Sequence, residues 1–238
     1  VYSAYAGSKF PIEYVFRLQK MLAKNLALPH QFCLLTDQAA AFKGHETIKA
    51  VPLRPCKEGG FFNKLQLFDP AMTGDEPFLY LDLTLVVLRS LEPLVHHGSN
   101  SGASLIAVDD WNWPNLNSCV MWIKPGEETQ SIWQLWSQGE RFGREFAGDQ
   151  NYIDFVMNER FVDRLGYWPE EYIASYKVLR KLSVVDQARA EQQLRKALIL
   201  KFHGMPRPPD VLNPLRHPWS TIFRHPFCPR VWRFLHKE

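Results

Sequence analysis

The sequence lacks several features that would place it in a specialised class of protein. Its four cysteines are scattered, with no Cys-x-x-Cys pair, so neither a zinc site nor a disulfide scaffold is expected, and a reducing compartment is the simplest inference. It has no run of about 18 apolar residues for a membrane span and no signal-peptide pattern. The formal net charge of +3 is too small for a general nucleic-acid binder. These absences favour a cytoplasmic globular protein with a local binding site.

Segments typical of strands alternate with segments typical of helices. Between the first two expected strands, apolar residues recur at helical spacing after Pro11, which suits a helix start. Strand, helix and strand in this order predict a parallel βαβ unit and an α/β fold. The expected strands of the first half cover residues 1–6, 31–37, 48–53 and 78–87.

The expected strand over residues 78–87 is interrupted by one acid, Asp82. A carboxylate within an apolar strand is costly unless it is paired, so Asp82 is either hydrogen-bonded inside the protein or presented to a ligand at a strand end. Side chains alternate along a strand, so Asp82 and Thr84 are expected to point the same way. Two oxygens at that spacing could share one hard cation.

Three further polar residues are expected near the same edge of the sheet. Lys9 follows the first strand, Asp37 ends the second, and Lys64 lies near the start of a helix expected over residues 61–68. Loops at the carboxyl ends of parallel strands commonly hold nucleotides. The alternative for both lysines is a solvated position on the surface.

The second half, after a turn cluster near residues 99–102, carries more polar signals. Asn117 lies in a polar corner that leads into a strand, and Asp149 with Gln150 opens a helix. Asp149 is also a natural N-cap, which does not exclude catalysis. An extended segment is expected over residues 172–177, a helix over 187–195, and a last strand over 198–204 that ends on His203-Gly204.

In their order and spacing, these signals resemble the nucleotide-sugar glycosyltransferases of the GT-A fold, in particular glycosyltransferase family 8. The resemblance covers roughly residues 1–209. It implies a Rossmann-like, mixed and mostly parallel sheet flanked by helices, with a nucleotide-binding half (1–98) and an acceptor half (99–209). The segments that carry it are residues 7–15, 33–37, 63–68, 79–87, 117–118, 148–150, 175–177 and 202–207.

The resemblance implies a role for each polar residue. In the family, two acids of an Asp-x-Asp motif and a loop histidine hold Mn²⁺, so the implied ligands of Mn²⁺ or Mg²⁺ are Asp82, Thr84 and His203. The implied catalytic residues are Asn117, which lines the sugar and acceptor pocket, and Asp149 with Gln150 beside the reacting carbon. Retention of anomeric configuration is implied as well. The expected nucleotide-binding residues are Lys9, Asp37, Lys64, Asp82, His203, Gly204 and Arg207.

Thr84 departs from the family pattern because it replaces the second acid. A hydroxyl can still ligate a hard cation, but the lost negative charge weakens metal affinity. Three outcomes stay open. A metal binds weakly, catalysis is metal-independent with Arg207, Lys64 and Lys9 carrying the charge, or the site is degenerate.

The expected activity is transfer of a sugar from a nucleotide-diphosphate donor, with UDP favoured as the nucleotide, to a cell-surface glycan or glycolipid such as lipopolysaccharide or capsule. One rival is a GT-A protein that binds nucleotide or glycan without turnover, which Thr84 supports. Another is a phosphate-ester hydrolase that uses Asp82 and His203. It lacks the cluster of carboxylates that two-metal hydrolysis needs.

The C-terminal tail, residues 210–238, is rich in arginine and aromatic residues. This composition suits peripheral contact with an anionic membrane surface, at the inner face, where a lipid-linked acceptor would reside. It equally suits a short helix packed on the domain with solvated arginines. No partnership with nucleic acid is expected, because no recognised module is present.

Overall fold

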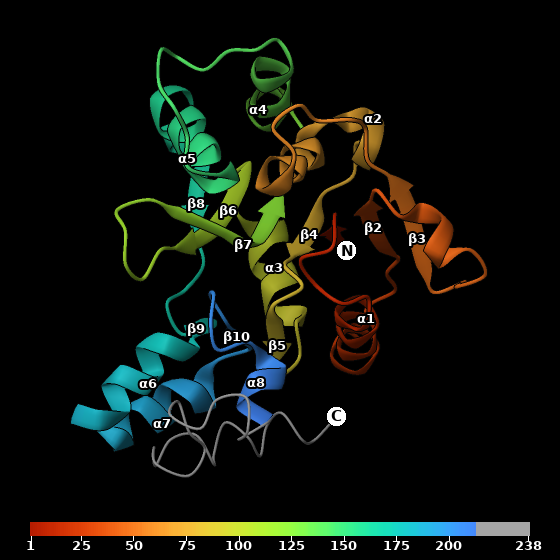
Figure 1. The fold of residues 1–238 in the computed structure, drawn as a ribbon. Helices are drawn as coiled ribbons and strands as arrows, with labels where there is room; N and C mark the ends of the chain where they lie inside the picture. The colour runs from red at the N-terminus through yellow and green to blue at the C-terminus, as the bar shows by residue number, and fades with distance from the viewer. Residues whose placement is uncertain (213–238) are drawn as a thin grey trace. The chain divides into compact units, whose positions relative to one another are not determined.

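The computed structural model describes residues 1–212, the last two by their backbone alone (Figure 1). The chain divides into two compact units. Unit 1 comprises residues 1–15, 29–83 and 93–168, and unit 2 comprises residues 16–28, 84–92 and, among the described residues, 169–212. Unit 1 contains segments from both sides of the expected seam near residue 99. The functional division into halves 1–98 and 99–209 stays a prediction, and most of the 210–238 tail lies outside the described residues.

Unit 1 is built on a mixed sheet. Within the described residues its strand order is β3-β2-β1-β4-β7-β6-β8. The pairs β3–β2, β2–β1, β1–β4 and β6–β8 are parallel, whereas β7 runs antiparallel to both β4 and β6. The predicted α/β class and mostly parallel sheet are confirmed. The strands are β1 (Tyr2–Tyr5), β2 (Phe32–Thr36), β3 (Ile48–Pro52), β4 (Phe78–Leu81), β6 (Leu105–Asp109), β7 (Leu116–Ile123) and β8 (Leu165–Tyr167).

Helices pack on this sheet because their apolar faces are buried against it. Helix α5 packs on β7, and α4 lies beside α5 and against η2 (Figure 1). Between them, Trp136 stacks on Phe62 with ring centroids 4.5 Å apart and meets the edge of Tyr152 at 4.7 Å. The helices of unit 1 are η1 (Ala39–Phe42), η2 (Gly60–Phe68), α2 (Pro70–Thr73), α4 (Glu127–Ser137), α5 (Asp149–Arg160) and η3 (Val162–Arg164), with α3 (Glu92–Asn100) from its second residue.

Unit 2 has a small sheet of its own. Within the described residues its order is β5-β10-β9, with β10 antiparallel to β5 and parallel to β9. Helices α6 and α7 pack against each other (Figure 1). Helix α1 (Glu13–Asn25) begins in unit 1 and continues in unit 2. The other elements are β5 (Leu85–Val87), β9 (Ile173–Ser175), α6 (Tyr176–Val185), α7 (Gln187–Lys196), β10 (Ile199–Lys201) and α8 (Pro208–Leu212).

The prediction of one strand over residues 78–87 is wrong. Strand β4 ends at Leu81 and β5 begins at Leu85, and the two strands belong to different sheets. Asp82 and Thr84 lie in the turn between them, so strand alternation does not fix their side-chain directions. The apolar run is continuous because both strands are buried, and burial alone does not reveal where the pairing partner changes.

Two other local predictions need correction. The helix expected over residues 61–68 is a 3₁₀ helix, η2. The segment 172–177 is extended only over Ile173–Ser175 and then enters α6, because the Ser175 hydroxyl accepts a hydrogen bond from the N–H of Val178 and caps that helix. Helix α7 confirms the prediction over residues 187–195.

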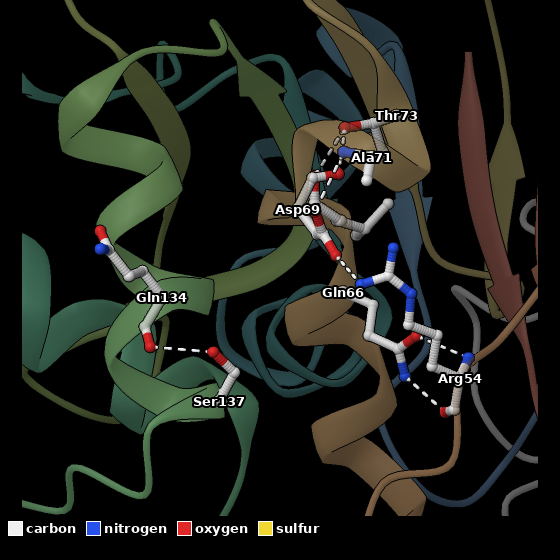
Figure 2. A network of polar contacts seen from close by, with 8 residues as sticks. Arg54, Gln66, Asp69, Ala71, Thr73, Gln134 and Ser137 are labelled. Atoms are coloured by element: carbon white, nitrogen blue, oxygen red, sulfur yellow. Dashed lines mark hydrogen bonds and ion pairs between the residues drawn. The ribbon is translucent and has the colours of Figure 1, made fainter.

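The C-terminal end of η2 is anchored by a polar network (Figure 2). The fully buried Gln66 side chain accepts a hydrogen bond from the backbone N–H of Arg54 at 2.8 Å and donates one to the Arg54 carbonyl at 3.0 Å. The Arg54 guanidinium pairs with Asp69, whose other carboxylate oxygen caps α2 by accepting from the N–H of Ala71. These bonds fix the helix that carries Lys64.

Among the described residues, no helix combines the length and apolar character that crossing a membrane requires.

Candidate active site

A buried ammonium group lies at the centre of the polar cluster of unit 1. Lys64 Nζ lies 3.1 Å from Asp82 Oδ1, 3.0 Å from Asp149 Oδ2 and 3.0 Å from Ser118 Oγ. An ammonium has three N–H donors, so these three oxygens account for all of them. The side chains of Lys64 and Asp149 are 13% and 8% exposed, which makes this a largely desolvated ion-pair cluster.

Strand pairing brings these residues together. Because β7 runs antiparallel to β4, the carboxyl end of β4 lies beside the amino end of β7, and the N–H of Asp82 donates to the carbonyl of Cys119 at 2.9 Å. Ser118 therefore lies next to the turn that carries Asp82. The Ser118 hydroxyl donates to Asp149 Oδ2 at 2.6 Å, and Asp149 is the first residue of α5, which packs on β7.

The reading of Asp149 as an N-cap is not supported. Gly148 occupies the N-cap position, and no side chain caps α5. The Asp149 carboxylate instead pairs with the Lys64 ammonium and accepts a hydrogen bond from the Ser118 hydroxyl. A negative charge in the first turn of a helix also interacts favourably with the positive end of the helix dipole. Gln150 follows Asp149 in the same turn and is half-buried.

The protonation states in the cluster follow from its charges. Burial disfavours the charged form of Lys64, but the carboxylates of Asp149 and Asp82 outweigh it and hold the pKa of Lys64 well above its ordinary value. Burial, reinforced by the nearby Asp82 charge, raises the pKa of the Tyr80 phenol. Tyr80 therefore keeps its proton and donates it to Asp82 Oδ1 at 2.8 Å. Asp82 is thus paired inside unit 1, which is one of the two alternatives that the sequence predicted for it.

Asn117 has a neighbouring but separate set of partners. Its amide donates to Asp110 Oδ2 at 2.6 Å, and its side-chain carbonyl accepts from the N–H of Cys119 at 3.1 Å. The other oxygen of Asp110 accepts from the N–H groups of Asn112 and Trp113, so this carboxylate orders the loop between β6 and β7. Asn117 is buried and fixed in position beside Ser118.

The loops after β1 and β2 meet, as the sequence predicts. The N–H of Gly7 donates to Asp37 Oδ2 at 2.9 Å, and the Gln38 amide donates to the Gly7 carbonyl at 2.8 Å. Gly7 has a positive φ of 66°, a conformation that glycine adopts without strain. Lys9 is exposed, and its ammonium lies 4.3 Å from the centroid of the Phe61 ring.

The remaining predicted site residues belong to unit 2. The half-buried Thr84 accepts a hydrogen bond from Lys201 Nζ at 2.9 Å. The imidazole of His203 is hydrogen-bonded through Nε2 to the Ser175 hydroxyl. Gly204 has a φ of 64°, and the N–H of the half-buried Arg207 donates to Asp210 Oδ2 at 2.8 Å.

The donor groups expected for a divalent cation do not fit that role as they are arranged. Within unit 1, the Asp82 carboxylate pairs with the Lys64 ammonium and accepts a hydrogen bond from the Tyr80 phenol. Within unit 2, the Thr84 hydroxyl accepts a hydrogen bond from the Lys201 ammonium. No group of three or more His, Cys, Asp or Glu side chains within the described residues has the arrangement of a metal site.

The fold has solved relatives among glycosyltransferases. The chain aligns over 99% of its length with the glycosyltransferase GlyE of Streptococcus pneumoniae TIGR4, with a TM-score of 0.62 and 16% identity. It aligns over its whole length with the galactosyltransferase LgtC, solved in complex with donor and acceptor sugar analogues, with a TM-score of 0.59 and 13% identity. The chain has the GT-A fold.

A third relative is the bifunctional glycosyltransferase WbbM, with a TM-score of 0.56 and 10% identity over 98% of this chain. The chain spans 61% of GlyE, 96% of LgtC and 51% of WbbM. No protein-family model and no curated protein sequence matches it. At these identities the likeness is one of GT-A fold, and the activity is argued from the site.

Proposed function

We propose that the protein is a glycosyltransferase that moves a sugar from a nucleotide-diphosphate donor to a saccharide acceptor. The observation that carries the proposal is the Lys64 ammonium held between Asp82 and Asp149 at the strand ends of a GT-A fold. A desolvated, fully hydrogen-bonded charge cluster is more costly than apolar packing of the same volume, and such clusters gather at functional sites.

The chemistry needs a fixed negative charge near the sugar. As the bond between the anomeric carbon and the diphosphate oxygen breaks, its electron pair leaves with the diphosphate and positive charge develops on the sugar ring. The acceptor hydroxyl then forms the new bond, and its proton passes to the departing diphosphate. In the proposed mechanism, Asp149 stabilises the positive sugar, because Lys64 and Ser118 hold its carboxylate in one orientation without reorganisation.

The finer assignments extend this proposal. UDP is the proposed nucleotide, a glycan or glycolipid of the cell surface is the proposed acceptor, and retention is the proposed stereochemical outcome. Asn117 and Gln150 line the proposed pocket for the donor sugar and the acceptor. Lys9 and Asp37 lie by the nucleotide, and His203, Gly204 and Arg207 by its phosphates. Contact with the inner face of a membrane depends on the 210–238 tail and stays a prediction.

The rival is a GT-A protein that binds nucleotide or glycan without turnover. Slow hydrolysis of a nucleotide sugar does not separate the two, since transferases also transfer to water. Incubation of the protein with UDP-glucose, UDP-galactose or UDP-N-acetylglucosamine and a panel of oligosaccharides, followed by mass spectrometry, does. A product heavier by one sugar supports the proposal. Nucleotide binding with no product from any pair of donor and acceptor supports the rival.

A further inference from the structure

One lysine occupies a strand position where an apolar residue is expected. Lys201 is the last residue of β10, follows two fully buried residues and is itself 6% exposed. A buried ammonium is costly unless oxygen atoms surround it. Its Nζ donates to Thr84 Oγ1 at 2.9 Å, so one of its contacts is with the residue that replaces the second acid of the Asp-x-Asp pattern.

The backbone of unit 2 fixes this contact. Lys201 pairs with Leu85 across the β10–β5 ladder, and the N–H of Phe202 donates to the Thr84 carbonyl at 3.1 Å. Tyr176 stacks on the Phe202 ring with centroids 4.7 Å apart. Lys201 therefore holds Thr84 through its hydroxyl, and Phe202, directly after β10, holds it through its backbone carbonyl.

Formal charges show what the exchange achieves. A divalent cation held by two carboxylates sums to zero. A neutral Thr84 in place of the second carboxylate raises the formal charge at this position by one, and the Lys201 ammonium bonded to it raises the charge by one more. Together these two changes supply the charge of +2 that a divalent cation would otherwise bring. A divalent ion bound to the Thr84 hydroxyl would lie close to the ammonium, and like charges repel strongly where water is excluded.

We propose that the ammonium of Lys201 takes the place of a metal ion at Thr84, and that the protein binds the donor diphosphate without a divalent cation. The inference rests on the proposed function, since it concerns how the same donor is held. The ammonium supplies a fixed positive charge that draws the diphosphate, and its anchor is the hydroxyl of Thr84. Arg207, in the loop that follows β10, adds a guanidinium suited to phosphate.

The test is calorimetric titration of the protein with UDP, and with GDP, CDP, ADP and dTDP, in EDTA and in Mn²⁺. We expect at least one nucleoside diphosphate to bind with the same dissociation constant, within about twofold, in both buffers. Binding that Mn²⁺ strengthens by about tenfold or more overturns the inference and leaves the proposed function standing. Binding of none of the five in either buffer overturns both.

Variants of Lys201 test the residue itself. Lys201→Met has a similar length and no charge, and we expect it to weaken binding by about tenfold or more in EDTA. Lys201→Arg keeps the charge and should recover part of the loss. Lys196→Met, an exposed lysine of unit 2, should bind as the parent protein does. Unchanged binding in a folded Lys201→Met protein, as judged by its melting transition, overturns the inference.

A double substitution at Thr84 and Lys201 tests whether a metal site can be created at this position. Thr84→Asp combined with Lys201→His restores a carboxylate and a neutral ring nitrogen, which are ligands that divalent transition metals accept. We expect nucleotide binding by this variant to be strengthened by Mn²⁺ by about tenfold or more, in contrast to the parent. A double variant that still binds the nucleotide equally in EDTA and Mn²⁺ counts against the assignment of this position to the cation.

Discussion

Asp149 Oδ2 lies 3.0 Å from Lys64 Nζ, and the two residues come from different helices that are separated by more than eighty positions in the chain. The pair joins α5 to η2, and Ser118 of β7 bonds to both partners. A cluster in which each member touches the other two is sensitive to the loss of any one of them.

The first prediction concerns the ammonium. Lys64→Met leaves Asp82 and Asp149 close together without their shared cation, and we expect the free energy of unfolding to fall by about 3 kcal/mol at neutral pH. Urea denaturation measures this loss of stability. The same substitution at an exposed lysine, Lys43→Met, is the control. A loss no larger than that of the control would show that the cluster does not stabilise the fold.

The second prediction is a pH dependence. The pKa of Lys64 is raised in the folded state, so its contribution to stability is complete below its unfolded pKa of about 10.4 and is lost as the pH rises through the folded value. Stability should therefore decline more steeply above about pH 10.4 in the parent protein than in Lys64→Met. Parallel pH profiles of the two proteins, measured by urea denaturation, would contradict this assignment.

The third prediction separates chemistry from binding. Asp149→Asn keeps the shape of the side chain and removes its charge, so we expect the transfer rate to fall by about 100-fold or more. The dissociation constant of the nucleoside diphosphate should change by less than about threefold. The exposed Asp75→Asn serves as the control. A large loss of nucleotide affinity with an unchanged transfer rate would assign Asp149 to binding instead.

The fourth prediction concerns the network that holds η2. Gln66→Ala leaves the backbone N–H and carbonyl of Arg54 without their partners and opens a cavity, so we expect a loss of about 3 kcal/mol of stability. The exposed helical Gln192→Ala should change stability by less than about 0.5 kcal/mol. Chemical denaturation measures the free energy of unfolding of both variants. Equal losses in the two variants would show that the network does not stabilise the fold.

The fifth prediction uses a pair of glycines in unit 1. A Cβ on Gly98 of α3 would overlap the Trp122 ring of β7, so Gly98→Ala should cost about 2 kcal/mol or more. A Cβ on Gly102 meets no atom within 4 Å, and Gly102→Ala should be nearly neutral. Equal thermal stability of the two variants would contradict this account of the contact between α3 and the sheet.

Hydrophobic patterning alone predicted the α/β class and most of the strands, because burial in a parallel sheet produces runs of apolar residues. It did not show that the run over residues 78–87 serves two sheets, since a strand's partners are chosen by distant parts of the chain. β4 pairs with β1 and β7, whereas β5 pairs with β10. The break at Asp82 therefore has no local signature beyond the acid itself.

The candidate site was predicted in part. The sequence suggested that Lys64 lies near Asp82, but it assigned the lysine to phosphate and did not foresee its bond to Asp149. Ser118 and Lys201 were absent from the predicted site residues. A lysine after the apolar Leu198-Ile199-Leu200 was a signal for a buried charge, because such a position is costly without a partner. Ser118 carried no such signal, since a serine in a buried strand is common.

The three hydrogen bonds of Lys64 have a consequence for its reactivity towards chemical reagents. An amine attacks acylating reagents only in its uncharged form, and a raised pKa leaves almost none of that form at neutral pH. Lys64 should stay unmodified while exposed lysines such as Lys9 and Lys43 are labelled. Mass spectrometry of the labelled protein would then find Lys64 unmodified. Labelling of Lys64 would show that its hydrogen bonds to Asp82, Asp149 and Ser118 had broken, and this measurement needs no substrate.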